Sequence, residues 1–226
     1  MICQLIGVKK TYPMGDLTVV ALSGIDVGVD AGEFTVFAGP SGSGKTTALN
    51  LIGCLDRPSS GQVLLDGRDV ATLGDDALGQ VRAKRIGFIF QSFNLIPVLT
   101  AAENVELALR LAGLDAGRKE KVEQALVDVG LKDFMGRRPN QLSGGQQQRV
   151  AIARALVKKP AIIIADEPTA NLDSHNGEAI LDLMRLMNER DRVTFLFSTH
   201  DPMVMARARR VVRLKDGAIV GDERMA

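Results

Sequence analysis

A glycine-rich run that ends in lysine and threonine is the part of this sequence best suited to chemistry. Residues 39–47 read Gly-Pro-Ser-Gly-Ser-Gly-Lys-Thr-Thr and fit the phosphate-binding pattern G-x-x-x-x-G-K-[ST]. The sequence predicts a short buried strand over 33–38 and a helix over 46–55. In that setting glycine backbone and a helix N-terminus bind a polyphosphate, and the alternative is a loop that only links strand to helix.

The side chains of this loop divide the work of holding a nucleotide. Lys45 is expected to reach the β- and γ-phosphates, and Thr46 to bind Mg²⁺ through its hydroxyl. Nucleotide contacts are expected from the whole loop: Gly39, Pro40, Ser41, Gly42, Ser43, Gly44, Lys45, Thr46 and Thr47.

Two carboxylates follow an apolar run at 161–165. A strand buried on both faces is typical of a parallel sheet, and ligands bind at the carboxyl ends of such strands. Asp166 is expected to hold Mg²⁺, and Glu167 to take a proton from an attacking water. The alternative is an acidic pair that caps the next helix.

A Ser-Gly-Gly turn leads into a predicted helix over 146–157. The stretch 142–149 reads Leu-Ser-Gly-Gly-Gln-Gln-Gln-Arg. Exposed N–H groups at a helix start, together with a serine hydroxyl, form a second candidate anion site. The alternative is an ordinary N-cap followed by a glutamine-rich helix.

The bulk composition excludes several classes of protein. The chain has 226 residues, 46% of them hydrophobic and 24% charged, with a net charge of +1, so no general electrostatic case for nucleic-acid binding exists. The cysteines, Cys3 and Cys54, form no C-x-x-C pair, and we expect a reducing, cytosolic compartment. Neither an 18-residue apolar run nor a signal peptide is visible.

Strands alternate with helices along most of the chain. Strands are expected over 2–10, 19–29, 62–65, 86–90, 161–166 and 193–198, with a turn-rich loop over 11–16 and a hairpin turn over 215–217. Helices are expected over 75–84, 101–111, 118–129, 146–157 and 177–189. We predict a parallel α/β core over 1–90 and 158–226, with an antiparallel β subdomain and a helical insertion over 91–157.

Taken together, 39–46, 142–149 and 162–167 resemble the motifs of the ATP-binding subunit of ABC transporters. The resemblance covers essentially the whole chain, because three motifs occur in the family order. It implies the P-loop ABC ATPase fold, with ATP and Mg²⁺ as ligands. It also implies that two copies pair head to tail, so that Ser143, Gly144, Gly145 and Gln146 of one copy close over the ATP of the other.

Smaller motifs extend the resemblance. Tyr12 is similar to the aromatic residue that stacks on adenine, although a lone tyrosine there could equally be a rim aromatic. Gln91 resembles the glutamine that touches Mg²⁺ and the attacking water. His200 resembles the histidine that contacts the γ-phosphate, and Asp173 belongs to a loop that meets the second copy. His175 is expected on the surface.

The stretches 54–58, 93–97 and 166–173 are similar to the LolD/MacB group of the family. That likeness implies a membrane permease partner, efflux or lipoprotein release, and a place on the cytoplasmic face of the inner membrane. The apolar side chains over 93–99 are suited either to a groove that accepts a partner's short helix or to the core of the helical block. Alternatives are an amino-acid importer ATPase, a signalling clamp on a membrane protein, and an ATPase acting on DNA or ribosomes.

Overall fold

The computed structural model describes residues 1–225, and the chain forms two compact units. The first contains Met1–Arg82 and Thr194–Ala226, and the second contains Ala83–Val193. Helix α2 (Asp75–Arg85) contains the boundary between them. The predicted helical block over 91–157 lies within the second unit, and its status as a separate subdomain stays a prediction.

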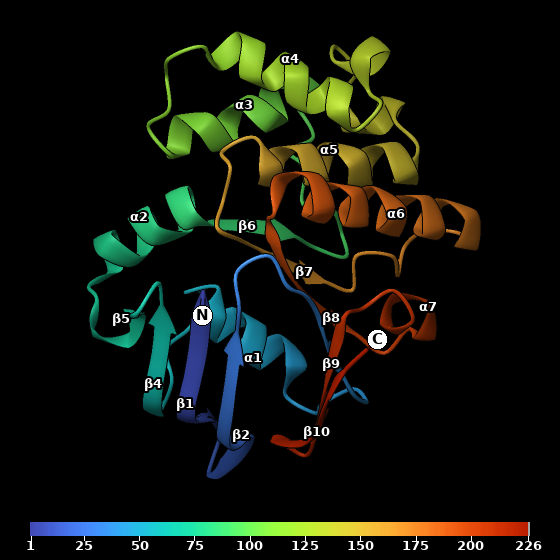
Figure 1. The fold of residues 1–226 in the computed structure, drawn as a ribbon. Coiled ribbons are helices and arrows are strands. Elements are labelled where there is room, and N and C mark those ends of the chain that lie inside the picture. The colour runs from blue at the N-terminus through green and yellow to red at the C-terminus, as the bar shows by residue number, and fades with distance from the viewer. Residues whose placement is uncertain (226) are drawn as a thin grey trace. The chain divides into compact units, whose positions relative to one another are not determined.

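An antiparallel sheet forms one layer of the first unit (Figure 1). Its strands have the order β2-β1-β4-β5, with β1 at Cys3–Met14, β2 at Leu17–Val29, β4 at Ser60–Leu65 and β5 at Arg68–Asp69. The expected loop over 11–16 is wrong. Strand β1 continues to Met14 because residues 11–14 keep pairing with β2, with Tyr12 opposite Val19, and only Gly15 and Asp16 turn.

The second sheet segment of this unit is built around β3 (Phe34–Ala38), whose five residues are all buried. Strand β3 lies parallel to both β8 (Thr194–Thr199) and β9 (Arg210–Lys215), and β10 (Ala218–Arg224) pairs antiparallel with β9. The rings of Phe34 and Phe197 lie 4.5 Å apart between centroids. Burial on both faces explains the continuous apolar runs in these strands.

Helices α1 (Lys45–Ile52) and α7 (Pro202–Met205) complete the first unit, together with a 3-10 turn at Val70–Thr72. Helix α7 has no counterpart in the sequence prediction, because four residues are too short for a periodic pattern to be visible. Asp201 caps it by accepting a hydrogen bond from the Met203 N–H at 2.8 Å.

The second unit has two parallel strands, β6 (Ile86–Ile89) and β7 (Ile162–Asp166), and helices above them in Figure 1. Its helices are α3 (Ala101–Leu111), α4 (Arg118–Asp128), α5 (Gly144–Leu156) and α6 (Ser174–Asp191), with 3-10 turns at Lys132–Phe134 and Pro139–Gln141. Gly87 lets α5 approach β6 closely, since a Cβ there would lie 3.0 Å from the Ala155 carbonyl oxygen.

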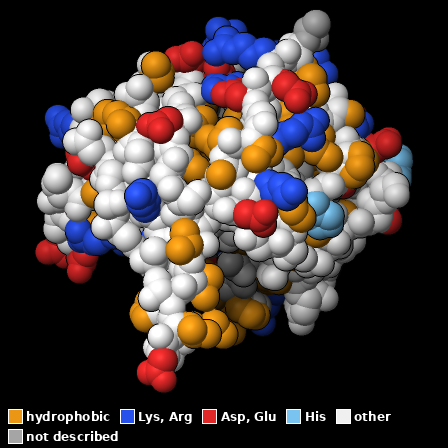
Figure 2. Space-filling view, turned by 90° about the horizontal axis from the view of Figure 1, so that it is seen from below, with side chains coloured by type: hydrophobic (Ala, Val, Ile, Leu, Met, Phe, Trp, Pro, Cys, Tyr) orange, Lys and Arg blue, Asp and Glu red, His pale blue; other side chains and the backbone are white. Residues whose placement is uncertain are grey.

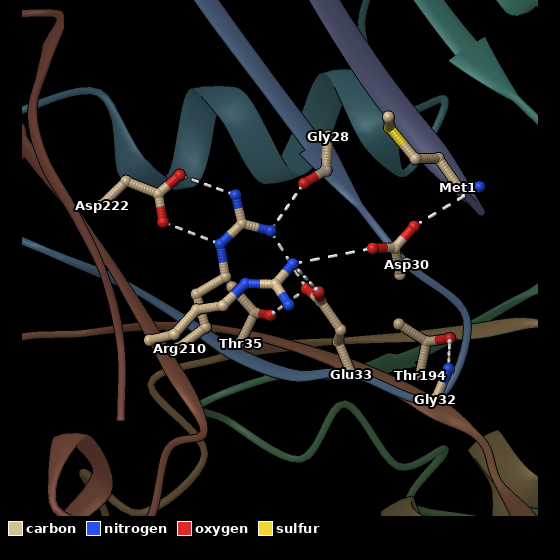
Figure 3. Close-up of polar contacts among 10 residues, drawn as sticks. Met1, Gly28, Asp30, Gly32, Glu33, Thr35, Thr194, Arg210 and Asp222 are labelled. Atoms are coloured by element: carbon tan, nitrogen blue, oxygen red, sulfur yellow. Dashed lines mark hydrogen bonds and ion pairs between the residues drawn. The ribbon is translucent and has the colours of Figure 1, made fainter. Parts of the chain in front are cut away.

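An ion-pair network fixes the C-terminal strand of the first unit (Figure 3). Arg210 is nearly buried and donates to both carboxylate oxygens of Asp222, at 2.7 and 2.6 Å. Its remaining N–H groups reach the Gly28 carbonyl at 2.7 Å and Glu33 at 3.1 Å. The hydrogen bonds from Arg210 hold the pKa of Asp222 below its usual range.

Asp222→Ala should lower the free energy of unfolding by about 1–2 kcal/mol at pH 7. This loss is smaller than that expected for a fully buried ion pair, because the Asp222 side chain is partly exposed. A depressed pKa means that this contribution is complete above the ordinary carboxyl range and disappears as pH falls through the pKa of folded Asp222. Urea unfolding as a function of pH measures it. The control, Glu223→Ala, removes an exposed pair to Arg213 at 3.4 Å and should change little; equal losses would contradict the prediction.

Candidate functional site

The phosphate loop leaves the carboxyl end of β3 and enters α1, as the sequence predicts. Gly39, Gly42 and Gly44 have φ angles of 152°, 78° and 100°, in the region that favours glycine. Space is also restricted. A Cβ at Gly39 would collide with the Leu214 carbonyl oxygen, and one at Gly44 would lie 2.6 Å from the Ala21 carbonyl oxygen.

The beginning of α1 is suited to an anion. Its N-cap, Gly44, supplies no side-chain hydrogen bond, and its first turn contains no acidic residue. The first N–H groups of a helix lack partners within the helix itself, and they form the positive end of the helix dipole, which favours an anion at this place.

Two side chains in the loop also fit a polyphosphate. Lys45 is buried, and its ammonium donates to the carbonyl oxygens of Gly39 at 2.7 Å and Pro40 at 2.9 Å. Both acceptors are neutral, so the charge of Lys45 remains for an anion. The Ser43 hydroxyl is buried and has no hydrogen-bond partner within residues 1–225, which marks a donor for a ligand oxygen.

His200 follows β8, the parallel neighbour of β3. Ala38, the last residue of β3, pairs with Thr199, so His200 and Gly39 leave the same edge of the sheet on adjacent strands. His200 is exposed, and the next residue, Asp201, is held by its N–H to the Thr199 hydroxyl at 3.0 Å. The structure thus brings His200 to the edge where the phosphate loop begins.

The predicted carboxylates and glutamine of the second unit also share one sheet edge. Gln91 follows β6, while Asp166 ends β7 and Glu167 follows it, and these two strands are parallel neighbours. Glu167 has a φ of 46°, in the left-handed region that non-glycine residues rarely adopt. The Asn171 amide donates to the Gln91 carbonyl at 3.0 Å and joins the two loops.

The stretch 142–149 contains the capped start of α5. The Ser143 hydroxyl accepts from the Gln146 N–H at 3.3 Å, and the Gln146 side chain accepts from the Ser143 N–H at 2.9 Å. This capping box uses a lone pair of the hydroxyl and leaves its O–H available as a donor. The structure therefore assigns Gln146 a role in shaping the loop; its contact with nucleotide stays a prediction.

Gly145 is required by packing against α6. A Cβ at Gly145 would lie 2.8 Å from the Asn176 side-chain oxygen. Asn176 is fixed in turn, because its N–H and side-chain amide donate to Asp173 at 2.9 and 2.6 Å. Those hydrogen bonds lower the pKa of Asp173. The predicted residues Ser143, Gly145 and Asp173 therefore lie together at the starts of α5 and α6.

The residues present are consistent with Mg²⁺ but not with a protein-built metal cage. Among residues 1–225, no three His, Cys, Asp or Glu side chains cluster as metal ligands. Mg²⁺ is commonly bound by substrate phosphates, waters and one or two protein oxygens, and the Thr46 hydroxyl and the Asp166 carboxylate are each chemically suitable as such an oxygen donor.

Comparison with known proteins decides the family. The family sequence model described as ABC transporter matches residues 22–170. The chain belongs to the ABC transporter family. The lipoprotein-releasing system ATP-binding protein LolD of Anaeromyxobacter dehalogenans is 50% identical over 97% of this chain and 92% of that protein.

Two further relatives are similar to this chain over nearly its whole length. The macrolide export ATP-binding/permease protein MacB of Syntrophobacter fumaroxidans is 47% identical over 96% of this chain, which spans only 31% of MacB. The dimeric cassette MJ0796 of Methanocaldococcus jannaschii, solved in a post-hydrolysis state with ADP and Pi, superposes with a TM-score of 0.91. It is 47% identical, and 99% of each chain is covered. The P-loop ABC ATPase fold predicted from the sequence is confirmed.

Sequence reasoning missed the partners of Tyr12 and the support of the loop after Gln91. The Tyr12 hydroxyl donates to Asp56 at 2.7 Å, and neither Asp56 nor Lys10 carried a predicted role. Arg154 donates to the carbonyl oxygen of Phe93 at 2.7 Å and to that of Asn94, two consecutive residues with positive φ. No short sequence motif predicts contacts between residues that are so far apart in the sequence.

Gly44→Ala in this ABC cassette should lower the free energy of unfolding more than Gly42→Ala. Both substitutions place a side chain at positive φ, which costs about 1–2 kcal/mol. Only the methyl at residue 44 meets backbone, because the space at Gly42 is open. We expect an extra loss of about 1–3 kcal/mol at residue 44, measured by urea unfolding. Equal losses would show that the loop moves away from Ala21 without cost.

Proposed function

We propose that this cassette binds and hydrolyses ATP as the ATP-binding subunit of a membrane transporter of the LolD/MacB type. The observation that carries the proposal is the glycine cradle at an uncapped helix start, with Lys45 buried in it. The chain's likeness to MJ0796, whose structure contains ADP and Pi, supports hydrolysis.

Binding is assigned to the first unit. The backbone N–H groups of the non-proline residues of 39–47 and the Lys45 ammonium hold the phosphates, and the base stacks on the ring of Tyr12. Thr46, Gln91 and Asp166 are the proposed ligands of Mg²⁺, which when bound neutralises charge on the phosphate oxygens. Pro40 and Ser41 shape the outer part of the loop.

Hydrolysis is assigned to groups at the strand ends. Glu167 takes a proton from the attacking water, and Gln91 orients that water. His200 and Lys45 stabilise the charge that develops on the transferring phosphoryl group. The positive φ of Glu167 supports a functional role, since non-glycine residues in this strained conformation cluster at active sites.

A second copy of the chain completes the site in this proposal. Ser143 keeps its hydroxyl proton free to donate, and the first N–H groups of α5 are presented at Gly144 and Gly145. With Asp173 at the same place, this surface would meet the γ-phosphate bound to the other copy. The dimeric MJ0796 cassette supports this arrangement.

The membrane partner is proposed to contact residues 93–99, where Val98 is 71% exposed. Asn104 shapes this segment, since its amide donates to three carbonyl oxygens and accepts from the Ile96 N–H at 2.8 Å. The structure contains no helix within residues 1–225 that is long and apolar enough to cross a bilayer. We propose a peripheral place on the cytoplasmic face of the inner membrane, attached to a permease.

Glu167→Gln should bind ATP normally but hydrolyse it about 10²–10⁴-fold more slowly, the usual contribution of a general base. Because the γ-phosphate then persists, the variant should change from monomer to dimer on addition of Mg-ATP. Single-turnover hydrolysis and light scattering measure the two effects. Glu178→Gln, on the exposed side of α6, is the control. Normal turnover in Glu167→Gln would remove the residue from this role.

Ser143→Phe should abolish hydrolysis while each subunit still binds ATP. Mixing it with an equally inactive Lys45→Ala variant should restore hydrolysis, because one composite site then has Lys45 from one copy and Ser143 from the other. Phosphate release from the mixture, compared with each variant alone, is the measurement. No restoration, with both variants folded, would mean that Ser143 serves the nucleotide of its own chain.

A further inference from the structure

A charged pair holds Tyr12, the only tyrosine of the chain. The Tyr12 hydroxyl donates to one carboxylate oxygen of Asp56 at 2.7 Å. The Lys10 ammonium donates to the other at 2.6 Å and lies over the Tyr12 ring, 4.8 Å from its centroid. Lys10 and Tyr12 are two residues apart on β1 and so project from the same face. One carboxylate therefore fixes both the outer end of the ring and the cation above it.

The three groups depend on one another electrostatically. Partial burial opposes ionisation of Asp56, but hydrogen bonds from Lys10, Tyr12 and the Arg57 backbone outweigh it and lower the pKa of the carboxyl group. Burial and the bond to Asp56 raise the pKa of Tyr12. The side chain of Lys10 is only 12% exposed, so the ammonium is not a mobile surface charge.

The cation leaves one face of the ring for a ligand. An ammonium over a ring occupies that face through attraction to its π-electrons. Tyr12 is nevertheless 36% exposed, and its cross-strand neighbour Val19 is 46% exposed. Figure 2, seen from the side where the β1–β2 hairpin ends in Figure 1, shows hydrophobic side chains gathered on this face. A flat aromatic base could cover the remaining surface.

Asp56 is tied to the helix that begins at the phosphate loop. The N–H groups of Leu55 and Asp56 both bond to the Asn50 carbonyl oxygen, in the last turn of α1, at 2.9 and 3.3 Å. The side chain of Thr47, in the first turn of the same helix, lies near enough to the Tyr12 hydroxyl to lower its pKa, against the larger effects that raise it. The ring is thus attached through Asp56 to the end of α1 and lies near its first turn, and α1 fixes its distance from the phosphate loop.

The geometry points to Asp56 as a positioning residue for the nucleotide. It holds Tyr12 and Lys10 so that a purine base stacks on one face of the ring while the phosphates occupy the loop before α1. This inference rests on the proposed ATP binding. In the alternative, the contacts of Asp56 with Lys10 and Tyr12 only fasten β1 to the end of α1. Their loss would then affect folding, but it would not lower the affinity for ATP more than the affinity for a polyphosphate without a base.

A comparison of two ligands tests the difference. Binding of Mg-ATP and of Mg-tripolyphosphate, which has no base, is measured on the full chain with Asp56→Ala. We expect ATP affinity to fall about 5- to 20-fold, the lower part of the range for one base–aromatic stack because the ring itself is kept, and tripolyphosphate affinity to change less than about 2-fold. In hydrolysis the loss should appear in KM rather than in kcat. The control, Asp75→Ala, removes a neighbouring pair with Arg57 at 2.8 Å and should leave both affinities unchanged.

A second variant covers the case in which Asp56→Ala unfolds. Tyr12→Phe keeps the ring and removes only the hydroxyl, so it should weaken ATP binding a few-fold and leave tripolyphosphate unchanged. In a folded double variant the two losses should not add, because both break the same contact. Unchanged ATP affinity in either variant, or equal loss of both ligands, would overturn the assignment. A wild-type chain that neither binds nor hydrolyses ATP would instead refute the proposed function.

Discussion

The N–H groups at the start of α1 have to bind a polyanion with no side-chain cap to satisfy them. That requirement places a glycine at the N-cap, a strand buried on both faces before it, and a lysine on the first turn. The left-handed backbone at Gly44 also brings the loop against the Ala21 carbonyl, so phosphate binding and packing need the same residue. The antiparallel sheet and the strands beside β3 support this loop.

The start of α5 differs from the start of α1 because its own side chains cap it. Here a serine and a glutamine satisfy the helix end reciprocally, so the loop keeps its shape without a ligand. It presents one hydroxyl proton and a few N–H groups, with no lysine beside them. This difference between the two loops fits the proposed order of events, in which one copy first binds the nucleotide and the second copy then closes over it.

The aromatic residue shows how a binding position can be fixed by distant parts of the chain. Tyr12 lies on an exposed hairpin, where a ring would ordinarily be free to move. Its hydrogen bond to Asp56, whose N–H is bonded to the Asn50 carbonyl oxygen, attaches it to the helix that follows the phosphate loop. In the proposed binding mode, base and phosphates would contact one rigid frame, which lowers the entropy lost on binding.

The sequence alone determined the strand–loop–helix at 33–55, the parallel frame and the order of the motifs, because these depend on short-range pattern and on glycine at fixed spacing. Tertiary structure decided what depends on contacts between distant segments. Pairing with β2 extended β1 through Tyr12, replacing the expected loop. Packing against Asn176 leaves no room for a side chain at residue 145, and Asp56, expected only as part of a stretch typical of one group of the family, is the partner of Tyr12. Local preference cannot reveal such contacts, since the free energy that selects them comes from residues far away in the chain.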